Sequence, residues 1–175
     1  MITKLGVTSI FVTHDQDEAI EVADEIIITN KGRVEQMGTP QEVYRDPHTA
    51  FTASFFGHTS FLEDYTKFKS FSTVENVDKA IVRPEFVKAS KKNENIIYRS
   101  SASEGEVIRT AFRGSCTELT ISVNGSIITA NRGLDEAPVE VGEKVNVFLY
   151  RIFVTAGDKA FLLENNAISD DSVFI

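Results

Sequence analysis

The residue best suited to chemistry in this 175-residue chain is His14. It follows residues 7–13, where apolar and β-branched side chains occupy both alternating sets of positions, a pattern that predicts a strand buried on both faces of a parallel sheet. An imidazole at the end of such a strand points into the crevice where α/β folds bind ligands, and it can donate a hydrogen bond to a phosphate oxygen. The alternative is a histidine that bonds only a neighbouring carbonyl group. His14 is therefore a candidate contact for a transferable phosphate.

A second candidate site is the loop at residues 113–117. Gly114 permits backbone N–H groups to converge on a ligand, Ser115 and Thr117 supply hydroxyl donors, and Arg113 supplies charge and a planar fork. This combination predicts a site for a small anion, with sulfate first. The alternative is a turn between strands that needs Gly114 for its backbone and leaves Arg113 in solvent.

The composition limits the other functions. The chain carries 26 acidic and 18 basic residues and a net charge of −8, which argues against a nucleic-acid or anionic-membrane binder, although a local basic patch stays open. The single Cys116 cannot form an internal disulfide and fits a reducing compartment. His48 and His58 lack the spacing of metal ligands, so we expect no metal site and place both on the surface.

Short helices and one hairpin are expected to hold His14 in place. The expected elements are a helix of about three turns capped by Asp15 with Glu18 as its capping-box partner, strands at 26–29 and 33–37 around a turn at 30–32, a helix capped by Thr39 that stops near Asp46, and a helix started by Asp46 and Pro47 and ended by Gly57.

Short alternating strands replace the helices after about residue 64, and they predict a small barrel or sandwich. The expected strands lie at 79–83, 95–99, 105–112, 118–123, 126–130, 145–150 and 160–163. Asn124 and Gly125 form the strongest two-residue hairpin signal in the chain. An oligonucleotide-binding barrel is a further alternative for this region, but the acidic balance argues against it.

Residues 11–19 resemble the switch-histidine segment of ABC transporter ATPases. Residues 23–24, 30–33, 36–40, 42–44, 47 and 53–57 continue this resemblance in the order found at the end of the nucleotide-binding domain in importers of the maltose and sulfate type. Residues 81–85, 105–107, 114–115 and 117–119 resemble the TOBE regulatory domain that follows in those subunits. Together the two resemblances cover nearly the whole chain.

The resemblance implies an α+β chain: residues 1–60 as the remnant of an α/β ATPase domain, and residues 61–175 as an all-β, OB-like small barrel. It implies that His14 is catalytic and contacts the γ-phosphate of ATP in a full-length subunit that uses Mg. It also implies a homodimer with a second copy, transmembrane permease partners and a cytoplasmic position at the inner face of the membrane. Sulfate or thiosulfate is the first expected solute, with sugar, polyamine, iron and molybdate as alternatives. A stand-alone oxyanion-sensing module is the other reading.

The sequence also departs from the family pattern. It contains no Gly-x-x-x-x-Gly-Lys-Ser/Thr loop, no Ser-Gly-Gly signature, and no apolar run ending in Asp-Glu before residue 7. We therefore expect no cofactor and no ATP hydrolysis for this chain alone, and a first region that is loosely folded or self-associates. Met1 is either an internal methionine or the result of a genuine truncation, and the sequence leaves both open.

Overall fold

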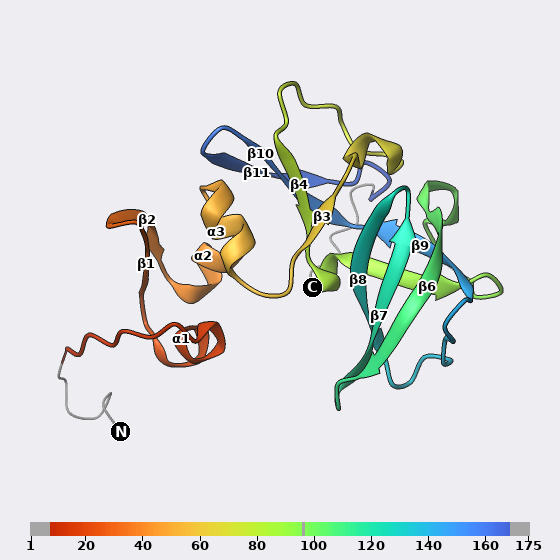
Figure 1. The fold of residues 1–175 in the computed structure, drawn as a ribbon, viewed down its shortest axis with the longest axis horizontal. Helices are drawn as coiled ribbons and strands as arrows, with labels where there is room; N and C mark the ends of the chain where they lie inside the picture. The colour runs from red at the N-terminus through yellow and green to blue at the C-terminus, as the bar shows by residue number, and fades with distance from the viewer. Residues whose placement is uncertain (1–7, 96, 169–175) are drawn as a thin grey trace.

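The computed structural model describes residues 8–95 and 97–168, which form mostly strands with a few short helices. The first part contains α1 (Gln16–Val22), β1 (Ile26–Asn30), β2 (Arg33–Gly38), α2 (Pro40–Arg45) and α3 (Ala50–Phe55). Figure 1 shows these elements on one side of the molecule and the larger sheets on the other. None of the described helices is long and apolar enough to cross a membrane.

The strand predicted at residues 7–13 is wrong over its described residues, because residues 8–13 form no strand. The side chains of Ile10 and Val12 are 93% and 90% exposed, and Phe11 is exposed as well. A strand forms only when a neighbouring strand satisfies its backbone groups, and no described strand pairs with this segment. Residue 7 lies outside the described residues.

The cap of α1 is confirmed, and its length is shorter than predicted. The Asp15 carboxylate accepts a hydrogen bond from the Glu18 backbone N–H at 3.1 Å. The Glu18 carboxylate does not return to Asp15 but accepts from the Thr13 hydroxyl at 2.9 Å. The helix therefore lacks the reciprocal capping box and runs for seven residues, about two turns.

The hairpin β1–β2 and the capping box of α2 are confirmed. Lys31 and Gly32 both have positive φ values, 48° and 78°, as a two-residue hairpin turn requires. Thr39 and Glu42 satisfy each other's backbone N–H groups at the start of α2, which ends at Asp46.

The start of α3 differs from the prediction. Thr49, and not Asp46, caps the helix by accepting from the Thr52 N–H at 3.1 Å. Asp46 instead caps the C-terminal end of α2. Its N–H donates to the Glu42 carbonyl at 2.9 Å, and its own carbonyl accepts from the Gln36 side chain. Gly57, with a φ of 72°, follows the end of α3 as predicted.

Two sheets make up the rest of the chain. One contains β11 (Lys159–Glu164), β10 (Arg151–Ala156), β4 (Lys79–Val82) and β3 (Ser60–Leu62), in that order. The other contains β5 (Val87–Lys91), β9 (Lys144–Leu149), β6 (Ser103–Phe112), β7 (Cys116–Val123) and β8 (Ser126–Gly133). The second sheet curls into a half-barrel, as expected for an OB-like fold (Figure 1).

The strands differ from the prediction in three ways. The strand predicted at 95–99 is a turn that leads into a 3₁₀ helix at Arg99–Ser101, with residue 96 outside the described residues. The strand predicted at 145–150 corresponds to β9, which ends at Leu149, and at Tyr150 the chain passes into β10 of the other sheet. The strands β3, β5 and β10 were not predicted. These differences arise where strand pairing with a distant segment overrides local preference.

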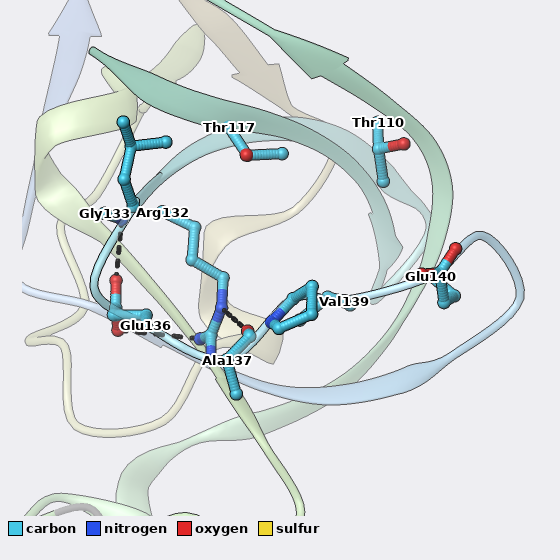
Figure 2. A pocket seen from close by; sticks show the side chains of 10 residues that line it. Thr110, Thr117, Arg132, Gly133, Glu136, Ala137, Val139 and Glu140 are labelled. Carbon is cyan, nitrogen blue, oxygen red and sulfur yellow. Dashed lines mark hydrogen bonds and ion pairs between the residues drawn. The ribbon is translucent and has the colours of Figure 1, made fainter. Parts of the chain in front are cut away.

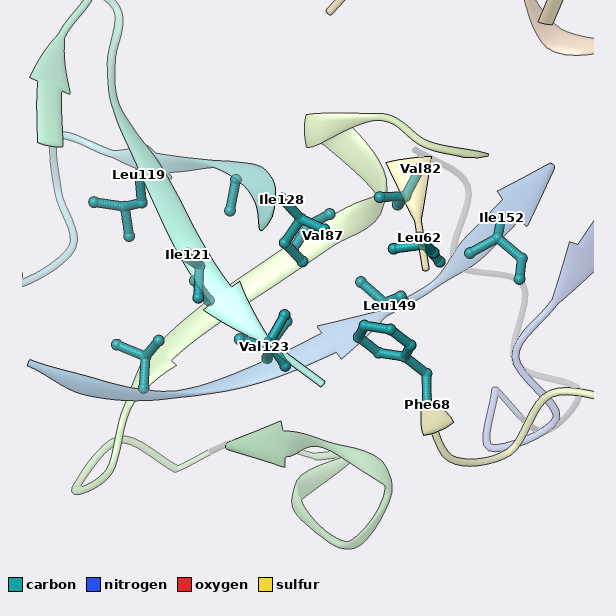
Figure 3. Packing of buried hydrophobic residues seen from close by; sticks show 14 of the residues in the cluster. Leu62, Phe68, Val82, Val87, Leu119, Ile121, Val123, Ile128, Leu149 and Ile152 are labelled. Carbon is teal, nitrogen blue, oxygen red and sulfur yellow. The ribbon is translucent and has the colours of Figure 1, made fainter. Parts of the chain in front are cut away.

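Side chains from both sheets share one apolar core (Figure 3). β7 directs Leu119, Ile121 and Val123 inward in strict alternation, and all three are buried. The hydroxyl of Ser60 accepts from the Thr129 N–H at 3.1 Å, and that of Ser126 accepts from the Glu63 N–H at 3.0 Å, so β3 is also held against β8 by side chains. The two sheets therefore pack as one unit.

Gly105 tests this packing, because a Cβ atom there would lie 2.7 Å from a methyl group of Ile121 and 3.0 Å from one of Val147. We expect Gly105→Ala to lower the free energy of unfolding by about 1–3 kcal/mol, measured by chemical denaturation. Glu106→Ala, on the exposed face of the same strand, should change it by less than about 0.5 kcal/mol. Equal denaturation midpoints for the two variants would contradict the packing.

Candidate functional site

His14 lies at the rim of an open hollow of about 450 Å³. The hollow is lined by His14, Asp15, Gln16, Asp17, Gly57 and His58. The Gln16 side-chain oxygen accepts a hydrogen bond from the Gly57 N–H at 2.9 Å, which ties the start of α1 to the end of α3. The hollow at His14 is therefore formed where the start of α1 meets the end of α3, segments 41 residues apart in the sequence.

His58 is exposed, as predicted, and it also lines the hollow with His14, which was not predicted. The preceding residue, Gly57, has a φ of 72° and lines the same hollow. The sequence did not predict that both histidines line one hollow, because this depends on how α1 and the end of α3 meet.

The hollow is incomplete as a phosphate site. Its six lining residues include two imidazoles and two carboxylates, but no Lys or Arg. Binding a phosphate requires several donors or cations around its oxygens. Within residues 8–95 and 97–168, no group of three or more His, Cys, Asp or Glu side chains could hold a metal ion. The hollow can therefore supply one imidazole contact to a ligand that other groups hold.

The predicted anion loop at residues 113–117 has the geometry of a hairpin turn. The Arg113 N–H donates to the Cys116 carbonyl at 2.9 Å, and Gly114 adopts a φ of 85°. The Arg113 guanidinium pairs with Glu118 at 2.7 Å, and this hydrogen bond holds the pKa of Glu118 below its ordinary value. An anion at this loop would have to displace Glu118.

The residues predicted for that loop do not converge on one space. Arg113, Gly114 and Ser115 are exposed, whereas Thr117 faces a different hollow of about 240 Å³ at one end of the barrel. Figure 2 shows Thr117 and Thr110 on one side of this hollow and Arg132 with Val139 on the other. The structure therefore separates Thr117 from its three predicted partners.

Arg132 dominates the barrel-end hollow and was not predicted. Its side chain is 2% exposed, and it donates to the carbonyls of Ala137 at 2.7 Å and Ala89 at 2.9 Å. It forms an ion pair with Glu94 and lies 3.5 Å from Glu136. The hydrogen bond from Arg132 is the main cause that lowers the pKa of Glu94.

The sequence does carry a signal for this residue. Ser126, Ile128 and Ala130 face inward along β8, and Arg132 continues the same alternation. An arginine at an inward position needs internal carbonyls or carboxylates as partners, and Arg132 has both.

Removal of the Arg132 guanidinium should lower the free energy of unfolding far more than removal of the exposed Arg113 guanidinium. We expect Arg132→Met to lower the free energy of unfolding by about 3 kcal/mol, because it leaves Glu94 without its buried partner. Arg113→Met should change it much less, because solvent screens the Arg113–Glu118 pair. Equal losses in denaturation experiments would show that Arg132 is not a structural centre.

The same pair predicts a pH dependence. The pKa of Glu94 is lowered from 4.5 in the folded protein, so its contribution to stability is present above pH 4.5 and is lost as the pH falls through the folded-state pKa. The stability difference between the wild type and Arg132→Met should therefore narrow in acid. A difference that stays constant down to the acid transition would contradict this assignment.

Comparison with known proteins points to one family. No protein-family model matches the chain. It is 36% identical to a spermidine/putrescine import ATP-binding protein, PotA, of Clostridioides difficile (strain 630), over 79% of this chain and 43% of that protein. The PotA of Protochlamydia amoebophila (strain UWE25) is 31% identical over 92% of this chain and 48% of its own length.

A third relative matches a shorter stretch at higher identity. The sulfate/thiosulfate import ATP-binding protein CysA of Vibrio vulnificus (strain CMCP6) is 56% identical over 63 residues, which are 35% of this chain and 18% of that protein. The chain thus spans less than half the length of these relatives. These similarities agree with the resemblance carried by the residues around His14, and the chain belongs to the family of ATP-binding subunits of ABC importers.

Proposed function

We propose that this chain is the C-terminal portion of the ATPase subunit of an ABC importer, in which ATP hydrolysis is coupled to solute uptake. The observation that carries the proposal is the similarity to importer ATP-binding proteins over 79–92% of the chain. His14 fits this function because it lines an open hollow, where an imidazole can reach a phosphate that other groups hold. The remaining contacts to ATP and Mg would come from other segments of the subunit.

We infer two domains for the proposed subunit, residues 1–60 at the end of the ATPase domain and residues 61–175 as a TOBE-like regulatory domain. The apolar clusters support this division, since one gathers Ile26, Ile28, Val43 and Phe56 and a separate, larger one lies between the sheets.

The proposed partners are a second copy of the subunit and transmembrane permease subunits, which would hold it at the inner face of the membrane. A small oxyanion at residues 113–117 stays a weaker proposal, because Glu118 already pairs with Arg113.

Two solute classes are supported by different relatives. Sulfate or thiosulfate is favoured by the 56% identity to CysA, which is confined to 35% of this chain. Spermidine or putrescine is favoured by the PotA relatives, whose similarity extends over most of the chain. Uptake of labelled sulfate and labelled putrescine by cells that carry or lack the full-length gene would distinguish the two classes.

In the full-length subunit, His14→Ala should slow ATP hydrolysis by roughly 100-fold and change nucleotide affinity little, because the imidazole contacts only the terminal phosphate. Steady-state hydrolysis and equilibrium nucleotide binding would be measured side by side. His48→Ala is the matched control, since His48 is exposed and lies outside the hollow. Hydrolysis at the wild-type rate in His14→Ala would remove the catalytic assignment.

The 175-residue chain by itself should not turn over Mg-ATP, because it has neither the phosphate-binding loop nor the Asp-Glu pair of the family. The measurement is phosphate release from a preparation whose His14→Ala variant serves as the control for contaminating ATPase. Release above a protein-free blank that disappears in the variant would overturn this expectation.

A further inference from the structure

Arg83 is a buried guanidinium with almost no hydrogen-bonded partners. It follows β4, begins the turn into the 3₁₀ helix Pro84–Phe86, and is 0% exposed. Its Nη1 donates to the Tyr44 carbonyl at 2.6 Å, whereas its Nε and Nη2 have no hydrogen-bond partner among the described residues. Burial lowers the pKa of Arg83 from its ordinary value. A charge in this position is tolerated only if other groups offset the loss of water.

Two aromatic rings supply that offset. The guanidinium carbon lies 4.0 Å from the centre of the Tyr44 ring and 4.8 Å from the centre of the Phe153 ring. Aromatic faces attract a cation more strongly when water is absent, and a planar guanidinium stacks on them where an ammonium group does not. Tyr44 belongs to α2 and Phe153 to β10, so Arg83 joins the helices to the four-stranded sheet.

Both the backbone and the side-chain hydroxyl of Tyr44 are bonded by residues of the turn at 83–86. Its carbonyl group, in the last turn of α2, accepts from Arg83, and its hydroxyl donates to Glu85. Burial and the bond to Glu85 raise the pKa of Tyr44 to about 12, so the phenol stays protonated and donating. The end of α2 is therefore fixed in both position and rotation.

A contiguous set of contacts leads from Tyr44 to the hollow at His14. The Tyr44 ring packs edge-on against Phe56, with ring centres 6.3 Å apart. The next residue, Gly57, donates its N–H to the side chain of Gln16, which lines the hollow beside His14. A second link between the two parts lies at the start of α3, where backbone hydrogen bonds join His48 and Ala50 to the β10–β11 hairpin.

We propose that Arg83 is a positioning residue: stacked between Tyr44 and Phe153, it fixes α2 on the four-stranded sheet and thereby sets the geometry of the hollow that contains His14. Only the consequence for a catalytic His14 rests on the function proposed above. The clamp formed by Arg83, Tyr44 and Phe153 is a property of this chain and can be tested without nucleotide.

The test uses NMR spectra of the 175-residue chain. Reporters in the first part are the methyl groups of Val43 and the amide of Gly57, and a reporter in the barrel is the methyl groups of Val147. In the wild type, the Arg83 Nε–H should give a slowly exchanging signal shifted by the two rings. In Arg83→Lys and Arg83→Met, the Val43 and Gly57 signals should move or broaden while the Val147 signals keep their positions.

Matched variants separate positioning from general destabilisation. Arg151→Met removes a partly exposed arginine, paired with Glu164, from the same strand as Phe153 and should leave the Val43 and Gly57 signals in place. Tyr44→Leu should reproduce the spectrum of Arg83→Met, and the double variant should add nothing to either. Tyr44→Phe keeps the ring and should retain most of the slowly exchanging Arg83 signal.

Three outcomes would overturn the proposal: wild-type Val43 and Gly57 signals in Arg83→Lys, equal changes in Arg83→Met and Arg151→Met, or a Val147 shift as large as that of Val43. If Arg83→Met fails to fold, the comparison of Arg83→Lys with Tyr44→Phe decides, because both retain a buried side chain of similar size. Spectra that contradict the clamp would not contradict the proposed importer function. The activity of the His14→Ala subunit, whether lost or retained, would not test the clamp.

Discussion

The inner faces of the two larger sheets are covered by each other, and this mutual burial governs the β-rich region. Side chains from β4 and β10 meet those from β5 to β9 in one apolar cluster. Burial of such surface contributes roughly 25 cal/mol per Å², so the inner positions of each strand are committed to apolar or small side chains. Gly105 shows how close the packing is, because even a methyl group would collide with Ile121. Any charged group near this core needs specific compensation.

Two buried arginines receive that compensation in different ways. Arg132, at the open end of the barrel, is surrounded by carbonyls and by the carboxylates of Glu94 and Glu136. Arg83, on the other face of the four-stranded sheet, has one carbonyl and two aromatic rings. The first arrangement neutralises charge within the barrel, whereas the second joins two segments that are far apart in the chain. Arg132 thus stabilises the barrel, whereas Arg83 joins α2 to the four-stranded sheet.

In contrast to the two buried arginines, His14 lies in open, polar surroundings. Its hollow is open and lined by polar residues, and the preceding residues 8–13 present apolar side chains to solvent. A segment with this strand-like pattern becomes buried only when strands pair with its edges and other elements cover both of its faces. In an importer subunit such a strand end is where a ligand phosphate would meet the imidazole, which is the role proposed for His14.

Local signals in the sequence determined the elements that depend on neighbouring residues. The Asp15 cap, the Lys31–Gly32 and Asn124–Gly125 turns, the Thr39 capping box and the Gly57 stop each involve backbone groups within a few residues, and the structure confirms them. The alternation along β7 and β8 predicted a small barrel or sandwich, and the family resemblance narrowed this prediction to an OB-like barrel.

The tertiary structure alone decided features that join distant residues. The strand expected at residues 7–13 is absent over its described residues, 8–13, because strand formation needs a partner, and β3 and β5 exist because partners are present. The placement of His58 beside His14, the pairing of Arg113 with Glu118, and the stacking of Arg83 between Tyr44 and Phe153 follow the same rule. A residue's type and spacing fix what contacts it can make, but the fold decides which group is close enough to make them, because hydrogen bonds, ion pairs and ring contacts act only over a few ångströms.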